Sequence, residues 1–151
     1  MAVVHLRVER GPHKGVSRAV IKKRAEAMLD ALNLRSEEVS IVLTDDAQIQ
    51  SLNRDYRKKD KPTDVLAFSL REGEFPETAG DLLGDVVVSV PTARRQAKAA
   101  KRELLDEMTM LIAHGVLHLL GWDHENAQKD RKMRAETERL CQAAAVRGRA
   151  K

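Results

Sequence analysis

The spacing of apolar residues along the chain alternates between the two-residue period of strands and the three- to four-residue period of helices. Runs rich in Val, Ile and Leu predict four strands, at residues 3–8, 39–43, 65–70 and 83–90. Apolar stripes predict five helices, at residues 18–32, 46–56, 91–102, 104–120 and 125–146. This order predicts an α/β (α+β) fold in one domain, residues 1–151, with helices packed on one sheet and an all-helical C-terminal part. The order of the strands does not follow from the sequence.

Polar residues, prolines and glycines mark where these helices begin and end. Ser17 and the residues at 44–46 are suited to cap helix N-termini, and Pro91 suits the first turn of a helix. Gly121 can adopt the left-handed conformation that ends a helix and turns the chain back. Residues 71–82 contain two glycines and one proline, which indicate a surface loop.

Composition narrows the class of protein without identifying it. The chain has 151 residues, and its 27 basic and 23 acidic side chains leave a net charge of +4, which is compatible with a polyanionic partner. The single cysteine excludes an internal disulfide framework, and 3% aromatic residues argue against a module that binds nucleic acid by base stacking. The chain shows neither a membrane-spanning apolar run nor the start of a signal peptide. We therefore expect a cytoplasmic protein with no membrane contact.

Three of the five histidines lie within eleven residues, in the segment His-Gly-Val-Leu-His-Leu-Leu-Gly-Trp-Asp-His. His114 and His118 are four residues apart in a predicted helix, so their imidazoles share one face and can bind the same cation. This face lies at the boundary between core and solvent, where a pocket can form. A helical wheel places it beside the apolar stripe formed by Met108, Leu111, Ile112 and Leu119.

His124 follows the turn at Gly121 and can supply a third ligand. Three protein ligands leave the fourth position open to water, which is the arrangement of a catalytic zinc site rather than a structural one. Asp123 has two interpretations: it holds a ligand imidazole through a hydrogen bond, or it stabilises the turn. Trp122 is typical of a packing residue that shields one side of the site.

The spacing of the histidines also matches the long signature of zinc peptidases, with one difference. Those enzymes carry a general-base glutamate directly after the first histidine, and this chain has Gly115 at that position. A peptidase with this sequence would lack the group that activates its water. We therefore interpret the histidines as a metal site used for another chemistry.

Three sequence blocks together resemble the YbeY-type bacterial rRNA maturation factors, a family of single-strand-specific, metal-dependent endoribonucleases. The most specific block is residues 114–124, and the other two are residues 53–68 and 83–89. The resemblance covers most of the chain. Trp122 stands where the family usually has tyrosine and Ala67 where it usually has serine, and neither difference removes a metal ligand.

The resemblance implies one zinc ion held by His114, His118 and His124, and hydrolysis of single-stranded RNA. It implies a role in maturing the 3′ end of the small-subunit (16S) rRNA and in ribosome quality control, with the ribosome or small-subunit proteins as partners. It marks Arg57 as a functional basic residue that faces the metal cleft. The implied fold is an α/β sandwich with a mixed four-stranded sheet, and the metal motif lies on a C-terminal helix and the turn after it.

The chemistry of such a site follows from the residues. A bound zinc ion lowers the pKa of its water to about 7 and polarises a phosphoryl oxygen. Negative charge grows on the phosphate oxygens in the transition state, and the parallel donors of the Arg57 guanidinium would stabilise it. Without the resemblance, Arg57 would be one more exposed cation in a basic run. The general base stays open between a metal hydroxide, Asp123 and the 2′-hydroxyl of the RNA.

Basic residues also share one face of the helix predicted after Pro91, and such a stripe can follow a phosphate backbone. They are Arg94, Arg95, Lys98, Lys101 and Arg102. The RNA-binding residues that we predict are Arg57, Arg94, Lys98, Lys101 and Arg102; the alternative for the stripe is a solvated helix face. Phosphate contacts position a substrate without reading its sequence, so specificity for one rRNA end would come from the ribosome or a partner protein.

The sequence therefore favours a zinc-dependent endoribonuclease that acts in rRNA processing. Two alternatives stay open. The first is a metal hydrolase of another class, such as a peptidase. The second is a ribosome-associated RNA-binding protein whose metal only stiffens the helix and turn. The oligomeric state and the cut site do not follow from the sequence.

Overall fold

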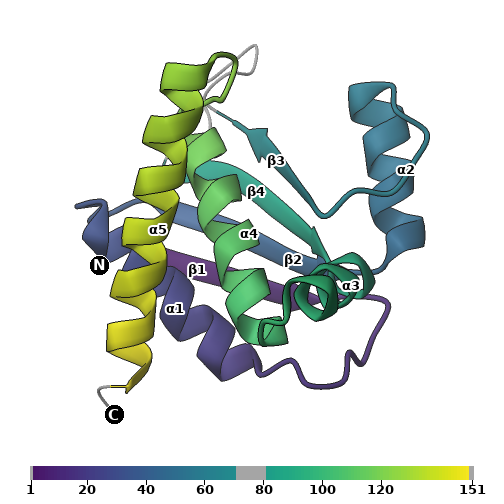
Figure 1. Cartoon of the computed structure of the whole chain (residues 1–151), viewed down its shortest axis with the longest axis horizontal. Helices are drawn as coiled ribbons and strands as arrows, with labels where there is room; N and C mark the ends of the chain where they lie inside the picture. Colours follow the sequence, from purple (N-terminus) through teal and green to yellow (C-terminus); the bar gives the residue numbers. More distant parts are fainter. Residues whose placement is uncertain (1, 71–80, 150–151) are drawn as a thin grey trace.

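The structure is a computed structural model that describes residues 2–70 and 81–149, with side chains as far as residue 145. Its strands are β1 (Val3–Val8), β2 (Glu38–Thr44), β3 (Val65–Ser69) and β4 (Leu82–Ser89). Its helices are α1 (Arg18–Ala31), α2 (Asp46–Arg57), α3 (Val90–Ala100), α4 (Leu104–Leu119) and α5 (Ala127–Arg149) (Figure 1). The predicted order of strands and helices is confirmed. Nearly all of the loop predicted at residues 71–82 lies outside the described residues.

The four strands form one mixed sheet, as the resemblance implies. Their order is β1-β2-β4-β3, which the sequence left open. The first three are parallel to one another, and β3 runs antiparallel to β4 at one edge of the sheet. The edge position of β3 matters for function, because this strand lies beside the helix that carries two of the clustered histidines.

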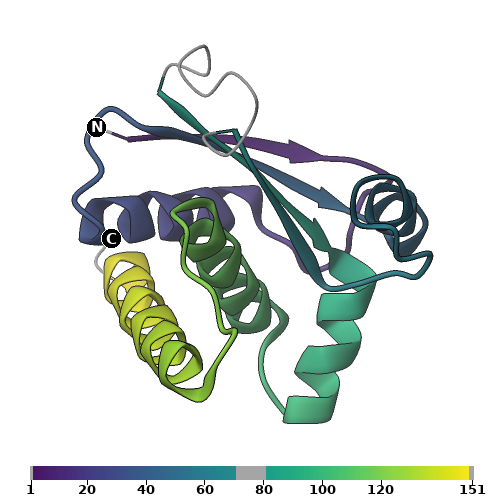
Figure 2. The same cartoon turned by 90° about the horizontal axis from the view of Figure 1, so that it is seen from above.

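Side-chain alternation along the strands divides the protein into two cores. One face carries residues such as Ile41 and Val86. Helices α1 and α4 cover this face, and α5 packs on those two helices (Figure 2). The opposite face carries Val42 and Val87, which pack with Ile49 of α2 in a smaller cluster. Because successive side chains of a strand point to opposite faces, β2 and β4 contribute to both cores.

The predicted helix ends are largely confirmed. The Ser17 hydroxyl accepts from the backbone N–H of Val20 at 3.3 Å, and the Asp45 carboxylate caps α2. Pro91 lies in the first turn of α3. This helix ends at Ala100, two residues before the predicted end, because Lys101 adopts a left-handed conformation with φ of +57°.

Helix α4 packs very closely on the sheet at the level of the histidines. A Cβ atom added to Gly115 would lie 2.6 Å from Cγ1 of Val86 and 3.4 Å from Cγ2 of Val65. Glycine thus permits a helix–sheet approach that any other residue would prevent. The predicted apolar stripe of α4 is confirmed as core, since each of its members is at most 3% exposed: Met108, Leu111, Ile112 and Leu119.

Helix α5 has 23 residues and packs against α1 and α4. Its buried residues include Met133, Leu140 and Ala144, and four of the six positions between Met133 and Leu140 are charged. In the part of the chain that the structure describes, no helix combines the length and the apolar character needed to cross a bilayer.

Candidate metal centre

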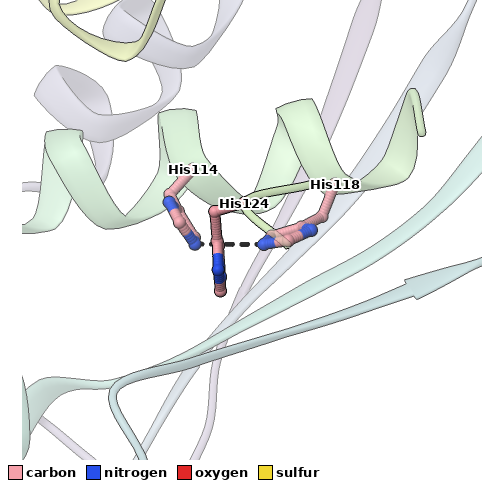
Figure 3. A group of neighbouring side chains, drawn as sticks. All are labelled: His114, His118 and His124. Carbon is pink, nitrogen blue, oxygen red and sulfur yellow. Dashed lines mark hydrogen bonds between the residues drawn. The ribbon is translucent and has the colours of Figure 1, made fainter. Parts of the chain in front are cut away.

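The structure brings the three predicted histidines together. His114 and His118 project from α4, and His124 projects toward them from the turn after that helix (Figure 3). The Nε2 atoms of His114 and His118 are 3.1 Å apart, and one nitrogen of each ring lies within 4.8 Å of the others. Two nitrogens bound to one tetrahedral zinc at about 2.0–2.1 Å are about 3.3 Å apart. His114 and His118 therefore have the spacing of two ligands of one ion, and the His124 nitrogen, within 4.8 Å, completes a group that could hold a metal ion.

A Schellman motif carries the chain from α4 back to His124. The backbone N–H of Gly121 donates to the carbonyl of His118, and that of Trp122 donates to the carbonyl of Leu117, both at 3.0 Å. Gly121 has φ of +93°, a conformation that favours glycine. As a result, the ring centroid of His124 lies 5.7 Å from that of His118.

The surroundings of the imidazoles keep two of them in the form that can bind a metal. Burial lowers the pKa of His114, and the nearby His118 and His124 lower it further, against a smaller opposing effect of Asp64 and Asp130. Burial is also the main cause that lowers the pKa of His118. At neutral pH these two rings are therefore uncharged, and an uncharged imidazole has a lone pair to donate.

The turn itself orients His118. A hydrogen bond between the His118 ring and the backbone of Trp122 favours one ring orientation, and Nε2 stays directed toward His114. The Asp123 carboxylate instead accepts from the backbone N–H of Glu125 at 3.1 Å and lies 3.5 Å from Nζ of Lys129. These are the contacts expected of a turn-stabilising residue. A role of Asp123 toward an imidazole stays a prediction.

The three histidines open into a cleft of 990 Å³ between β3, α4 and α5. Several of its lining residues were not singled out by the sequence analysis, among them Asp64, Asp130 and Thr137. Asp64 precedes β3, whereas Asp130 and Thr137 lie two turns apart on one face of α5. Their relation to the histidines depends on how α5 packs against α4, and no local sequence pattern contains that information.

Arg57 lies at the rim of this cleft. Its guanidinium donates to the carbonyl of Ala67 at 2.6 Å, and the guanidinium carbon is 5.0 Å from the centre of the Phe68 ring. Ala67 itself lines the cleft. After burial and His124, the charge of Arg57 is a further cause that lowers the pKa of His118. Arg57 is not itself a lining residue of the cleft, and its action on a ligand bound at the histidines stays a prediction.

The basic stripe on α3 is less continuous than predicted. Arg94 donates to the carbonyl of Lys14 at 2.5 Å, and Arg95 forms an ion pair with Asp46 at 2.7 Å. Arg102 lies beyond the end of α3, so the predicted helical face does not include it. Lys98 on α3 and Lys101, which directly follows the helix, are exposed.

Arg102 instead reaches the far end of the histidine cleft. Its Nη1 atom lies 3.3 Å from a carboxylate oxygen of Glu107, whose side chain is 5% exposed. A buried carboxylate needs such a partner, so this ion pair is part of the fold as well as of the cleft wall.

The close packing at Gly115 bears on the peptidase alternative. This residue occupies the position at which zinc peptidases carry their general-base glutamate. Here that position faces Val86 and Val65 in the core, and the 2.6 Å approach leaves no space for a side chain. A glutamate could be placed there only if α4 moved away from the sheet.

Comparison with known proteins agrees with this geometry. The family model described as Endoribonuclease YbeY matches residues 9–145. Endoribonuclease YbeY of Aquifex aeolicus is 49% identical over 119 residues, which cover 78% of this chain and 77% of that protein. Endoribonuclease YbeY of Syntrophotalea carbinolica is 38% identical over 136 residues, which cover 90% of each.

A solved structure shows the same fold. The solution structure of TM1509 from Thermotoga maritima superposes with a TM-score of 0.66, at 23% identity, over 95% of this chain and 89% of that one. The resemblance drawn from three sequence blocks is confirmed by the family match and by the curated relatives. The chain belongs to the endoribonuclease YbeY family.

Proposed function

We propose that the protein is a zinc-dependent endoribonuclease that hydrolyses phosphodiester bonds of single-stranded RNA. Its place of action would be the cytoplasm, in maturation of the 16S rRNA 3′ end and in ribosome quality control, with the ribosome or small-subunit proteins as partners. One observation carries this proposal: three imidazoles converge in an open cleft, in a chain of the endoribonuclease YbeY family.

His114, His118 and His124 would hold the zinc ion. Three nitrogen donors with one open position are the ligand set of catalytic zinc sites. When bound, zinc would supply a Lewis acid for a phosphoryl oxygen and a lower pKa for the attacking water. The backbone of the turn orients His118, and the low pKa of His114 keeps that ring uncharged.

Arg57 would stabilise the negative charge that develops on the phosphate. Its bond to Ala67 uses one of its N–H groups, which leaves other donors of the planar guanidinium for a phosphate oxygen. Stacking over Phe68 restrains the group beside the cleft. Asp123 is less well placed as general base, because Glu125 and Lys129 already engage its two oxygens.

The proposal is tested by comparing two substrates and two histidine variants. The wild-type protein should cut single-stranded RNA in a metal-dependent manner and leave casein intact. His118→Ala should lose at least about 100-fold in rate, because it removes a metal ligand. His5→Ala is the matched control, since His5 lies on β1 and pairs with Glu38 rather than with the cleft.

Three outcomes would overturn the proposal. RNA cleavage at the wild-type rate in His118→Ala would show that the metal site is not catalytic or that another ribonuclease contaminates the sample. Cleavage of casein would favour the peptidase alternative. RNA binding without any cleavage would favour the binding-protein alternative.

A further inference from the structure

The histidine cleft continues well beyond the metal centre, between α4 and α5. Six residues on one face of α5 line it, and they are Asp130, Met133, Arg134, Thr137, Glu138 and Cys141. At 1.5 Å per residue, they span about 16 Å of helix. Asp130 marks the histidine end, since its charge acts on His114, and Cys141 marks the other end, near Arg102. We call the part of the cleft lined by Met110, Leu111, Met133, Thr137 and Cys141 the α4–α5 arm.

The arm has mostly apolar walls, and its polar groups are the Thr137 hydroxyl and, beside Cys141, the exposed carboxylate of Glu138. Two methionines, a leucine and a cysteine form its walls. Thr137 is 9% exposed and lines the cleft, and no described residue hydrogen-bonds to its hydroxyl. The hydroxyl is not among the fully buried side-chain atoms without a partner in the described residues, so it keeps surface that is open to the cleft. A ligand in the cleft can therefore reach it and form a hydrogen bond with it.

The charges near the arm argue against a phosphate as that ligand. Arg134 pairs with Asp130 at 2.9 Å, and Arg102 pairs with Glu107 at 3.3 Å. Both cations of the arm are thus already neutralised by carboxylates of the chain. Arg57, on the β3 side of the histidines, has no carboxylate partner among the described residues. The phosphate therefore belongs on the Arg57 side, and the arm suits an uncharged group.

We propose that the α4–α5 arm binds the base of an unpaired nucleotide next to the scissile phosphate. This inference rests on the proposed endoribonuclease function and specifies the part of the substrate that the cleft selects. Thioether groups contact aromatic rings favourably, so the half-buried Met110, whose sulfur lies 3.5 Å from Nη1 of Arg102, suits the face of a base. Met133 is 2% exposed and forms the floor of the arm as part of the core. The Thr137 hydroxyl both donates and accepts, which allows it to bond to any of the four bases.

A base in this arm gives a physical reason for selecting single strands. In a duplex, the bases are stacked and paired, and a base must be unstacked before it can enter a side cleft. An unpaired nucleotide avoids most of that cost. Recognition of one base by apolar contact also works without a platform of protein aromatics, of which this chain has few.

The first test fills the arm. Thr137→Leu adds bulk to the wall, and Ala135→Leu adds bulk to an exposed position of α5 that does not line the cleft. On a short single-stranded RNA whose cut position has been mapped, Thr137→Leu should lower kcat/KM at least about tenfold, and Ala135→Leu should leave it unchanged. Thr137→Val keeps the shape and removes the hydroxyl, so it should lower kcat/KM about fivefold.

The substrate provides the matching change. An abasic ribose beside the scissile bond should lower kcat/KM of the wild type by about as much as Thr137→Leu does, and it should lower that of Thr137→Leu no further. The inference would be overturned if the loss from Thr137→Leu and the loss from the abasic ribose multiplied, whichever side of the scissile bond carried the abasic ribose. So would full activity of Thr137→Leu on the intact RNA.

A second test needs no catalysis. Cys141 is the single cysteine of the chain and lines the arm, so its reaction with methyl methanethiosulfonate reports occupancy. Millimolar AMP should slow this reaction at least about fivefold, whereas ribose 5-phosphate, which has no base, should not. Equal protection by both compounds, or by neither, would overturn the inference.

The two tests separate this inference from the proposed function. If AMP protects Cys141 but no RNA is cut, the base site stands and the endoribonuclease proposal fails. If RNA is cut through the histidines but neither the abasic ribose nor AMP has an effect, the enzyme proposal stands and the base site fails.

Discussion

Two arginines, Arg102 in the wall of the cleft and Arg57 beside it, differ in the groups that their guanidinium contacts. Arg57, at the β3 rim, donates to the carbonyl of Ala67 and stacks on Phe68. Arg102, at the far end, pairs with the nearly buried carboxylate of Glu107. Among the described residues, Arg57 has no carboxylate partner, whereas the charge of Arg102 is balanced by Glu107.

This difference assigns separate tasks to the two ends of the cleft. A guanidinium with no carboxylate partner among the described residues, close to the uncharged rings of His114 and His118, would attract a phosphate and stabilise added negative charge. At the other end, the Arg102 guanidinium is paired with Glu107 and the walls are mostly apolar, so this end suits an uncharged group. Removal of the Arg57 guanidinium should therefore affect catalysis, whereas removal of the carboxylate partner of Arg102 should affect stability.

The largest effect on catalysis is expected for Arg57→Ala. Loss of the guanidinium should lower the rate of RNA cleavage by about 10²–10³, the range seen when one transition-state donor is removed. Its hydrogen bond is exposed, so the free energy of unfolding should change by less than about 0.5 kcal/mol. Urea denaturation measures this change, and an equal loss of stability and activity would make Arg57 structural.

The opposite pattern is expected for Glu107→Gln. This change leaves the Arg102 guanidinium without its carboxylate partner and should lower the free energy of unfolding by about 1–3 kcal/mol. The cleavage rate of the folded protein at saturating RNA should stay within about threefold of wild type. A catalytic loss as large as that of Arg57→Ala would remove the contrast between the two ends of the cleft.

Phe68→Leu sharpens the account of Arg57. The change keeps an apolar side chain but removes the ring under the guanidinium, and it should lower kcat about fivefold with little effect on KM. In an Arg57→Ala background it should lower kcat no further, because Phe68 acts through Arg57. Rescue of kcat by Phe68→Tyr would support this positioning role, and additive losses in the double variant would contradict it.

The smallest effect concerns the compensated Arg95, which pairs with Asp46. Burial alone would raise the pKa of Asp46, but hydrogen bonds from Ser89, Thr92 and Arg95 and the Arg95 charge outweigh it and lower that pKa. A carboxyl whose pKa is lower in the folded state stabilises the protein above its unfolded pKa, and this stability is lost as the pH falls through the folded pKa.

Asp46→Asn should therefore reduce the free energy of unfolding at pH 7 by about 1 kcal/mol or less, and the difference from wild type should shrink toward pH 3. Urea denaturation at several pH values measures it. A difference that grows as the pH falls would contradict the sign of the pKa change.

The sequence predicted the metal centre because its determinants are local. The segment from His114 to His124 contains the two ring positions on α4, the glycine of the Schellman turn and the third ring. Neither a distant contact nor a partner element is needed to bring these rings together. The helix caps and the order of elements could be predicted for the same reason.

The rest of the cleft could not be predicted, since it depends on packing between distant segments. Thr137 lines the arm only because α5 folds back along α4, and the strand order that places β3 at the edge has no local signal. The end of α3 could not be predicted either, because Lys101 adopts a left-handed conformation that is usual for glycine or asparagine. The position of Arg102 in the cleft wall follows from this helix end, so it could not be predicted from the sequence.

The central claim, that three histidines hold one metal ion, is tested most directly by zinc stoichiometry and affinity. Metal analysis of the purified protein, with competition against a chromophoric chelator, should give one zinc per chain for wild type and for His5→Ala. Zinc binding should be weaker by more than about 100-fold in each of three variants, His114→Ala, His118→Ala and His124→Ala. This loss is larger than that typical of residues that only hydrogen-bond to a metal ligand. Wild-type affinity in any of these three variants, or no zinc binding by the wild type, would contradict the account.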